Sequence, residues 1–167
     1  MCSLSRTTPR LPSRSVDERG GMTSDLEIRT FRTEDLDQVV EIEKAAFPDP
    51  YSRPLFQWLG VTTGNGFIVA CRERVLGYLI PEIRGGQGHI VSMAVNSECR
   101  RKGIGEALLR EAIARMASKV DEAYLEVRAG NEAAIRLYEK HSFKMTGDVL
   151  KGYYPDGESA IVMSRAL

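Results

Sequence analysis

The sequence contains few cysteines and no long apolar stretch. Its three cysteines, Cys2, Cys71 and Cys99, are odd in number, lie far apart and form no CxxC pair. This spacing argues against a disulfide framework or a cysteine zinc site, and it favours a reducing compartment, here the cytoplasm. No apolar run approaches the ~20 residues that a helix needs to cross a bilayer, so we expect no membrane partner.

The chain also lacks an excess of either charge sign. Lysine and arginine together number 23, as do aspartate and glutamate, so the formal net charge is zero. A general nucleic-acid surface needs a basic excess, so we expect no nucleic-acid partner. With 167 residues, 43% of them hydrophobic, the chain is typical of one soluble globular domain that buries its own core.

The first 25 residues differ in composition from the rest. Arginine-rich, serine-rich and acid-poor composition can mark a transit peptide, but prolines oppose the amphipathic helix that such a peptide forms. We therefore expect a disordered leader over residues 1–25 and a single domain over residues 26–167. The residues that set the leader apart are Arg6, Pro9, Arg10, Pro12, Arg14 and Arg19.

From residue 26 onward the hydrophobic pattern is regular and predicts a mixed α+β fold. A strand–helix–strand unit in the middle predicts a parallel strand pair, with antiparallel pairs elsewhere. Residues 84–88 are expected to form a loop. Apolar stripes, caps and proline stops predict helices from residue 36 to the prolines at 48 and 50, and over 54–60, 104–119 and 131–140. Alternation and apolar runs predict strands over 26–31, 66–72, 75–83, 89–95, 123–128, 143–150 and 158–164.

A basic, glycine-containing loop lies between a predicted strand and a predicted helix. The first turn of a helix has unpaired N–H groups and a partial positive charge, and glycines let the backbone approach an anion closely. The loop thus predicts a pyrophosphate site, although a solvated basic turn has the same composition. A dinucleotide fold is disfavoured, because Leu108 occupies the third glycine position of its motif. The loop consists of Arg100, Arg101, Lys102, Gly103, Ile104 and Gly105.

The predicted helix over residues 131–140 carries an amide and a phenol on one face. Asn131 and Tyr138 are seven residues apart, or two helical turns, so both side chains can point at one elongated ligand. Taken alone, each is explained more simply, Asn131 as an N-cap and Tyr138 as core packing.

Together these features resemble the GNAT acyltransferase superfamily over about residues 26–167. The resemblance implies a mixed, mostly antiparallel sheet of about seven strands with one splayed parallel pair, flanked by about four helices. Two motifs of the superfamily occur in the right order on the right predicted elements. Its Arg/Gln-x-x-Gly-x-Gly/Ala loop matches at Arg100, Gly103 and Gly105, and its Asn-x-x-Ala-x-x-x-Tyr helix matches at Asn131, Ala134 and Tyr138.

Further segments are similar to a narrower group, the protein N-terminal acetyltransferases. Residues 88–90, 125–128 and 151–158 resemble the archaeal and eukaryotic enzymes. Residues 47–52 resemble both these and the bacterial ribosomal-protein alanine acetyltransferases. One position departs from the pattern, because Asp49 stands where many relatives carry a glutamate that helps to read the first residue of the substrate.

The resemblance implies acetyl-coenzyme A (acetyl-CoA) as co-substrate and direct attack of an amine on its acetyl carbon in a ternary complex. It also implies that the pantetheine arm pairs with the strand over residues 93–95, that Asn131 steadies the cofactor near the thioester, and that Tyr138 protonates the leaving thiolate. The pyrophosphate would take the amides of residues 101–106. The cofactor-binding candidates are Met93, Ala94, Val95, Arg100, Arg101, Lys102, Gly103, Ile104, Gly105, Glu106, Asn131 and Tyr138.

Two residues are candidates for the base that accepts the amine proton. Imidazole groups ordinarily titrate near neutrality, which suits His89 to this task. Glu126 lies between two apolar residues in a strand that we expect helices to cover on both faces, where an unpaired carboxylate costs free energy. Either residue can act directly or through a water molecule. Two ligands make a poor zinc site, so we expect no required metal.

The energetics of deprotonation favour an N-terminal amine as acceptor. Freeing an α-amino group at pH 7 costs ~1–1.4 kcal/mol, against ~4.6 kcal/mol for lysine. The predicted function is therefore acetylation of protein N-termini, and whether this occurs at the ribosome stays open. The alternatives are a lysine or small-amine acetyltransferase and a non-catalytic acyl-CoA sensor or partner subunit. By resemblance, the substrate-binding candidates are the loop residues Asp49, Tyr51, Tyr153 and Tyr154.

Overall fold

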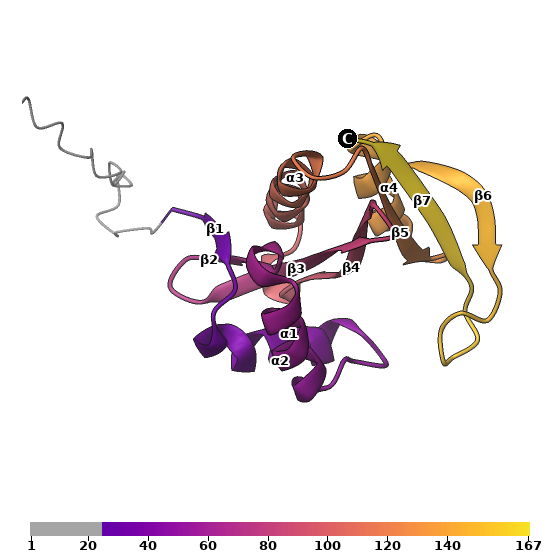
Figure 1. Cartoon of the computed structure of the whole chain (residues 1–167). Coiled ribbons are helices and arrows are strands. Elements are labelled where there is room, and N and C mark those ends of the chain that lie inside the picture. Colours follow the sequence, from indigo (N-terminus) through magenta and orange to yellow (C-terminus); the bar gives the residue numbers. More distant parts are fainter. Residues whose placement is uncertain (1–24) are drawn as a thin grey trace, which may run out of the picture.

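The computed structural model describes residues 25–167, which form a seven-stranded sheet with α-helices on both faces (Figure 1). Of the predicted leader over residues 1–25, all but Asp25 lies outside the described residues. The strands are β1 (Glu27–Thr30), β2 (Ile68–Cys71), β3 (Val75–Arg84), β4 (Gln87–Val95), β5 (Glu122–Arg128), β6 (Lys144–Leu150) and β7 (Ala160–Ala166). The α-helices are α1 (Leu36–Ala46), α2 (Arg53–Thr62), α3 (Ile104–Ala117) and α4 (Glu132–Lys140).

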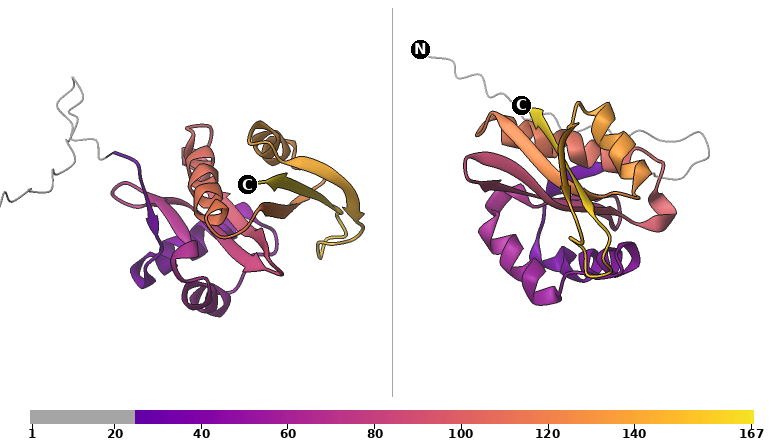
Figure 2. Two further views of the ribbon diagram at one scale, coloured as in Figure 1. Left: turned by 45° about the horizontal axis from the view of Figure 1, so that its top comes forward. Right: turned by 90° about the vertical axis from the view of Figure 1, so that its right-hand side faces the viewer.

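The strand order in the sheet is β1-β2-β3-β4-β5-β7-β6. Every neighbouring pair is antiparallel except β4 and β5, which run parallel. Only three residue pairs join β4 to β5, and the last of them is Ile90 with Leu125. Beyond this pair both strands continue, to Val95 and Arg128, without pairing with each other, so the sheet opens between them (Figure 2). The predicted mixed sheet with one splayed parallel pair is confirmed.

A proline in β3 coincides with the point where β4 leaves β5. Pro81 has no N–H to donate, and the β3–β4 register shifts there. Ile80 faces Ser92 while Pro81 faces Ile90, which leaves Val91 as the extra residue of a bulge in β4. A bulge bends its strand and strengthens the local twist. The bulge therefore turns β4 directly after its last pair with β5.

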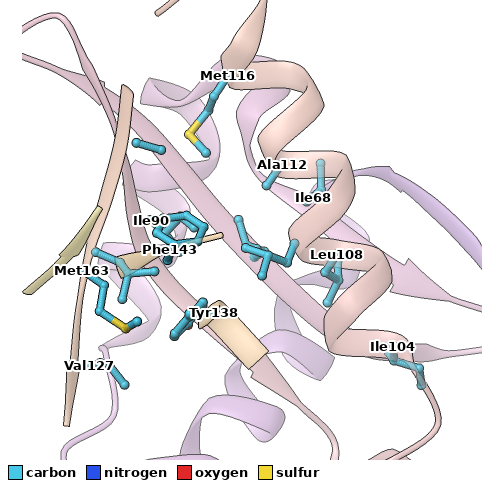
Figure 3. Packing of buried hydrophobic residues seen from close by; sticks show 14 of the residues in the cluster. Ile68, Ile90, Ile104, Leu108, Ala112, Met116, Val127, Tyr138, Phe143 and Met163 are labelled. Atoms are coloured by element: carbon cyan, nitrogen blue, oxygen red, sulfur yellow. The ribbon is translucent and has the colours of Figure 1, made fainter. Parts of the chain in front are cut away.

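Two apolar cores lie on opposite faces of the sheet. One lies beneath α3 and α4, and the other beneath α1 and α2 (Figures 1 and 3). The apolar pattern of α3 predicts a buried stripe of Ile104, Leu108, Leu109, Ile113 and Met116. All are buried except Ile113, which is partly buried, and Ala112 is fully buried as well. Buried residues of the first core include Ile90, Leu108, Met116, Tyr138, Phe143 and Met163, and those of the second include Leu36, Val39, Phe56, Phe67 and Tyr78.

The expected loop over residues 84–88 is shorter than predicted. Arg84 and Gln87 already pair with each other in the β3–β4 ladder, so only Gly85 and Gly86 form the turn. Both glycines have positive φ, 58° and 82°, as a tight two-residue hairpin turn requires. Because these two glycines form a tight turn, the loop has two residues instead of the five predicted.

Within residues 25–167, no helix has the length and apolar character needed to span a membrane.

Loss of core packing under α3 should destabilise the fold strongly. Leu108 is fully buried, so Leu108→Ala should lower the free energy of unfolding by about 2–5 kcal/mol in urea titrations. Val61 on α2 is 82% exposed, and Val61→Ala serves as a control expected to stay within about 0.5 kcal/mol of wild type. Equal effects of the two variants would contradict this assignment of the core.

Candidate active site

A groove of about 410 Å³ occupies the opening between β4 and β5, and we call it the central groove. Residues 90–93 of β4 and 126–128 of β5 line its two sides, and α4 adds Asn131, Ala134 and Tyr138. The loop after α1 and the loop between β6 and β7 form its rim. The structure thus brings together eight of the predicted site residues: Asp49, Tyr51, Met93, Glu126, Asn131, Tyr138, Tyr153 and Tyr154.

Glu126 projects from the side of β5 that faces the groove. Burial alternates along β5, and its buried residues Ala123, Leu125 and Val127 pack in the core that lies under α3 and α4. The Glu126 side chain, by contrast, is 19% exposed and lines the groove. The expectation that helices cover both faces of this strand is therefore wrong. Access to the groove also explains how a carboxylate is accommodated between two apolar neighbours.

His89 lies directly behind Glu126. Its Nε2 is 2.7 Å from Oε2 of Glu126, and its ring stacks on Tyr124 with 4.5 Å between the ring centroids. His89 is only 8% exposed and is not among the residues that line the groove. The geometry therefore ranks the two candidate bases. Glu126 faces the space where a ligand can bind, whereas His89 contacts it from behind.

Tyr138 approaches the groove from the opposite side, on α4. It is 7% exposed, and burial, with a smaller contribution from Tyr154, raises the pKa of its phenol well above the ordinary value. The phenol is protonated at neutral pH, as a tyrosine ordinarily is, and burial makes it a weaker acid than an exposed tyrosine. Directly before α4, Asn131 Oδ1 accepts the Ala134 N–H at 3.2 Å. Asn131 thus caps the helix and lines the groove as well, so the cap explanation and the ligand explanation are compatible.

A second cavity, of about 450 Å³, lies between the start of α3 and α4. No side chain caps α3, whose N-cap Gly103 has a φ of 78°, so the first-turn amides are left for a ligand. Lys102 does not line this cavity, because its Nζ donates to the Glu98 carbonyl at 3.1 Å. The predicted loop residues that do line it are Arg100, Arg101, Gly103, Ile104, Gly105 and Glu106, together with Val95 of β4.

The structure adds two cations to this second cavity that the sequence analysis missed. Arg136 and Lys140 lie one turn apart on α4, and both line the cavity opposite the loop. Lys140 Nζ is 2.7 Å from Glu106 Oε2, which lowers the pKa of the Glu106 carboxyl. A cavity with helix-start amides and basic side chains on two sides fits a diphosphate group. In the sequence, the spacing of four residues between these two cations, on the helix that follows Asn131, could have predicted that they share one side of the helix.

A buried carboxylate beneath the rim was also missed. Glu43 on α1 is 2% exposed, accepts the Tyr51 N–H at 2.9 Å and accepts a hydrogen bond from the Tyr78 hydroxyl. The Tyr78 hydroxyl lies 3.0 Å from that of Ser92. This network joins the loop after α1 to β3 and β4. The signal in the sequence was a charged residue at a core-facing position, since Glu43 follows Leu36 and Val39 at helical spacing.

No metal site is found among the described residues. Within residues 25–167, no group of three or more histidine, cysteine, aspartate or glutamate side chains is arranged to hold an ion.

Comparison with known proteins places this geometry in a family. The sequence profile of the acetyltransferase (GNAT) family matches residues 28–143. The chain belongs to the GNAT family. This confirms the resemblance drawn from the motifs, and the seven-stranded sheet that opens between β4 and β5 is the GNAT fold.

The chain is similar to several N-acetyltransferases. An N-alpha-acetyltransferase of Saccharolobus solfataricus is 40% identical over 158 residues, which span 86% of this chain and 94% of the relative. The structure of Ard1 from Thermoplasma volcanium has a TM-score of 0.82 at 28% identity, covering 85% of this chain and 97% of that one. The ribosomal-protein-S18-alanine N-acetyltransferase of Escherichia coli has a TM-score of 0.76 at 30% identity, covering 85% and 94%.

Burial of Glu43 should make stability depend on pH. Desolvation raises the Glu43 pKa above its ordinary value of 4.5, outweighing the hydrogen bonds from Tyr51 and Tyr78. The resulting stabilisation is complete below the unfolded-state pKa and is lost as pH rises through the folded-state pKa. Glu43→Gln removes this titration and keeps an oxygen that can accept the Tyr51 N–H. The variant should therefore gain stability relative to wild type as the pH rises from below 4.5 toward neutrality.

Urea unfolding across that pH range measures the difference. Glu41 is exposed on the same helix, so Glu41→Gln is the matched control and should follow the wild-type pH dependence. A constant difference between Glu43→Gln and wild type at every pH would contradict the raised pKa.

Proposed function

We propose that this GNAT protein transfers the acetyl group of acetyl-CoA to the free N-terminal amine of proteins. The proposal depends chiefly on one observation, that Glu126, backed by His89, and Tyr138 line the same groove from opposite sides. A proton acceptor and a proton donor thus flank the space between β4 and β5, as transfer between an amine and a thioester requires.

In the proposed complex, acetyl-CoA spans both cavities. The first-turn amides of α3, with Arg100, Arg101 and Arg136, hold the diphosphate in the second cavity. The pantetheine arm lies along residues 93–95 of β4, whose edge toward β5 has no strand partner beyond Ile90 among residues 25–167. The N–H and C=O groups of that edge can pair with the amides of the arm. Asn131, at the mouth of the central groove, steadies the arm near the thioester.

The side chains of the groove then accept and donate the protons of the reaction. The bound cofactor supplies an acetyl thioester, which the acceptor amine attacks directly. Glu126 accepts the proton that the amine must lose, and the 2.7 Å contact with His89 fixes the carboxylate in place. Tyr138, the phenol that lines the groove from α4, donates its proton to the departing sulfur.

The acceptor side of the groove suits a peptide N-terminus. Asp49, Tyr51, Tyr153 and Tyr154 lie on loops at the rim, where aromatic rings can contact a peptide backbone. Deprotonation at pH 7 also costs an α-amine only ~1–1.4 kcal/mol, against ~4.6 kcal/mol for lysine. The names of the relatives agree with this class of substrate. We propose the cytoplasm as location, in agreement with the free thiol groups of the chain.

Peptide acetylation assays test the choice of acceptor. Short peptides that begin with Ser, Ala or Met should be acetylated at the N-terminus, as seen by mass spectrometry and by release of free thiol from acetyl-CoA. The same peptides blocked at the N-terminus should give no product, even when they contain lysine. Product confined to blocked, lysine-containing peptides would indicate a lysine acetyltransferase. Thiol release with neither set would indicate another amine, and its absence together with tight CoA binding would indicate a sensor.

Removal of the proposed base should slow the reaction without weakening cofactor binding. Glu126→Gln should lower kcat by about 10²- to 10⁴-fold, because the amide cannot take up the amine proton. The dissociation constant of acetyl-CoA, measured by calorimetry, should stay near that of wild type. Glu122 lies on the same side of β5 but outside the groove, so Glu122→Gln is the matched control. Full activity of Glu126→Gln would rule out proton transfer through this carboxylate.

A further inference from the structure

We propose that Arg128 is a positioning residue that fixes the loop between β6 and β7 as the peptide-side rim of the central groove. The inference rests on the proposed function in one respect, that the groove receives a peptide. Arg128 is the last residue of β5 and follows Glu126 by two positions, so both side chains project from the same side of the strand.

The Arg128 side chain is engaged by the loop on three sides. Its Nη1 is 2.7 Å from a carboxylate oxygen of Asp156 and 2.7 Å from one of Glu158. Its guanidinium lies over the ring of Tyr154, 3.9 Å from the ring centroid. The Arg128 side chain is 16% exposed, whereas those of Asp156 and Glu158 are 42% and 35% exposed, so the guanidinium is largely covered while the carboxylates stay accessible to solvent. An arginine suits this position, because its planar group can stack and bridge two carboxylates at once.

Backbone contacts complete the attachment of the loop to β5. The second carboxylate oxygen of Glu158 accepts the Gly130 N–H at 2.9 Å. Within the loop, the Tyr154 N–H donates to the Glu158 carbonyl at 3.1 Å, and the Gly157 N–H donates to the Tyr154 carbonyl at 2.8 Å. The loop therefore closes on itself as a compact turn, and the side chain of Glu158 ties that turn to the end of β5.

The attachment determines where the two rim tyrosines lie. Tyr154 is held from below by Arg128, and the Tyr153 ring packs edge-on against it with 5.1 Å between the centroids. Both tyrosines line the groove. Since Arg128 and Glu126 belong to one strand, the rim is held at a fixed offset from the proposed base. Loss of Arg128 should loosen the rim and weaken peptide binding, while the diphosphate cavity at the start of α3 is unaffected.

Two variants separate positioning from direct contact with the peptide. Arg128→Lys keeps the charge but loses the planar group, and it should raise the KM for peptide about 5- to 30-fold. The double variant Asp156→Asn with Glu158→Gln keeps Arg128 but weakens its hold on the loop, and it should raise the peptide KM in the same direction. For both variants the KM for acetyl-CoA should stay within about twofold of wild type.

A control arginine tests whether the effect is a general loss of stability. Arg115 on α3 bonds to Glu111, to the Thr30 hydroxyl and to the Asn65 carbonyl, away from the groove. Arg115→Lys should therefore leave the peptide KM unchanged at temperatures well below its Tm. An increase in peptide KM for Arg128→Lys alone, without one in the double variant, would mean that Arg128 touches the peptide itself and would overturn the proposal. The proposal would also be overturned if all kinetic constants of Arg128→Lys changed in parallel with the fraction of folded protein.

Limited digestion with chymotrypsin measures the loop without relying on activity. Chymotrypsin cuts after tyrosine, and Tyr153 and Tyr154 both lie in this loop. Cleavage there should therefore be faster in Arg128→Lys and in the double variant than in wild type. Equal cleavage rates would overturn the positioning role. If wild type acetylates no peptide yet the loop variants are cut faster, the proposed function fails while the attachment of the loop by Arg128 stands.

Discussion

The early end of the β4–β5 ladder is the constraint on which the site depends. If the two strands stayed paired to their ends, residues 90–93 and 126–128 would face each other across hydrogen bonds and leave no room for a ligand. The bulge at Val91, opposite a proline that cannot donate, bends β4 where the pairing stops. The open edge of β4 exposes N–H and C=O groups that favour a partner. A ligand with amides along its length satisfies them, and the pantetheine arm is such a ligand.

Charge is divided between the two cavities that meet along β4. Basic side chains from the loop before α3 and from α4 surround the second cavity, whereas carboxylates line the central groove on its acceptor side. The second cavity therefore attracts a diphosphate and the central groove attracts an ammonium group, although the chain as a whole has no net charge. Local grouping of charge, rather than overall composition, carries the functional information. The acceptor-side carboxylates are Glu43, Asp49 and Glu126.

The parts of the site that the sequence predicted are those that depend on short-range signals. Gly103 before an apolar stripe indicated a helix start open to an anion, and the spacing of Asn131 and Tyr138 placed both on one side of a helix. The hydrogen bonds of Glu43 join residues 8 and 35 positions apart, and those between Arg128 and the β6–β7 loop join residues about 30 apart. No periodicity encodes such contacts, because the folded sheet creates them. Glu126 was found as a carboxylate between two apolar strand residues and His89 as an imidazole, but no pattern in the sequence predicted that the two side chains touch.

Strand β5 shows why stability and function are coupled in this fold. Its alternate residues Ala123, Leu125 and Val127 are buried in the core, which fixes the register of the strand through burial. The residues between them lie on the other side of the strand: Tyr124 stacks on His89, Glu126 faces the groove, and Arg128 contacts the β6–β7 loop. A shift of one residue would turn all three to the core side and expose the apolar residues. The hydrophobic effect that folds the domain therefore also sets the positions of base and rim relative to each other, and no separate device is needed to align them.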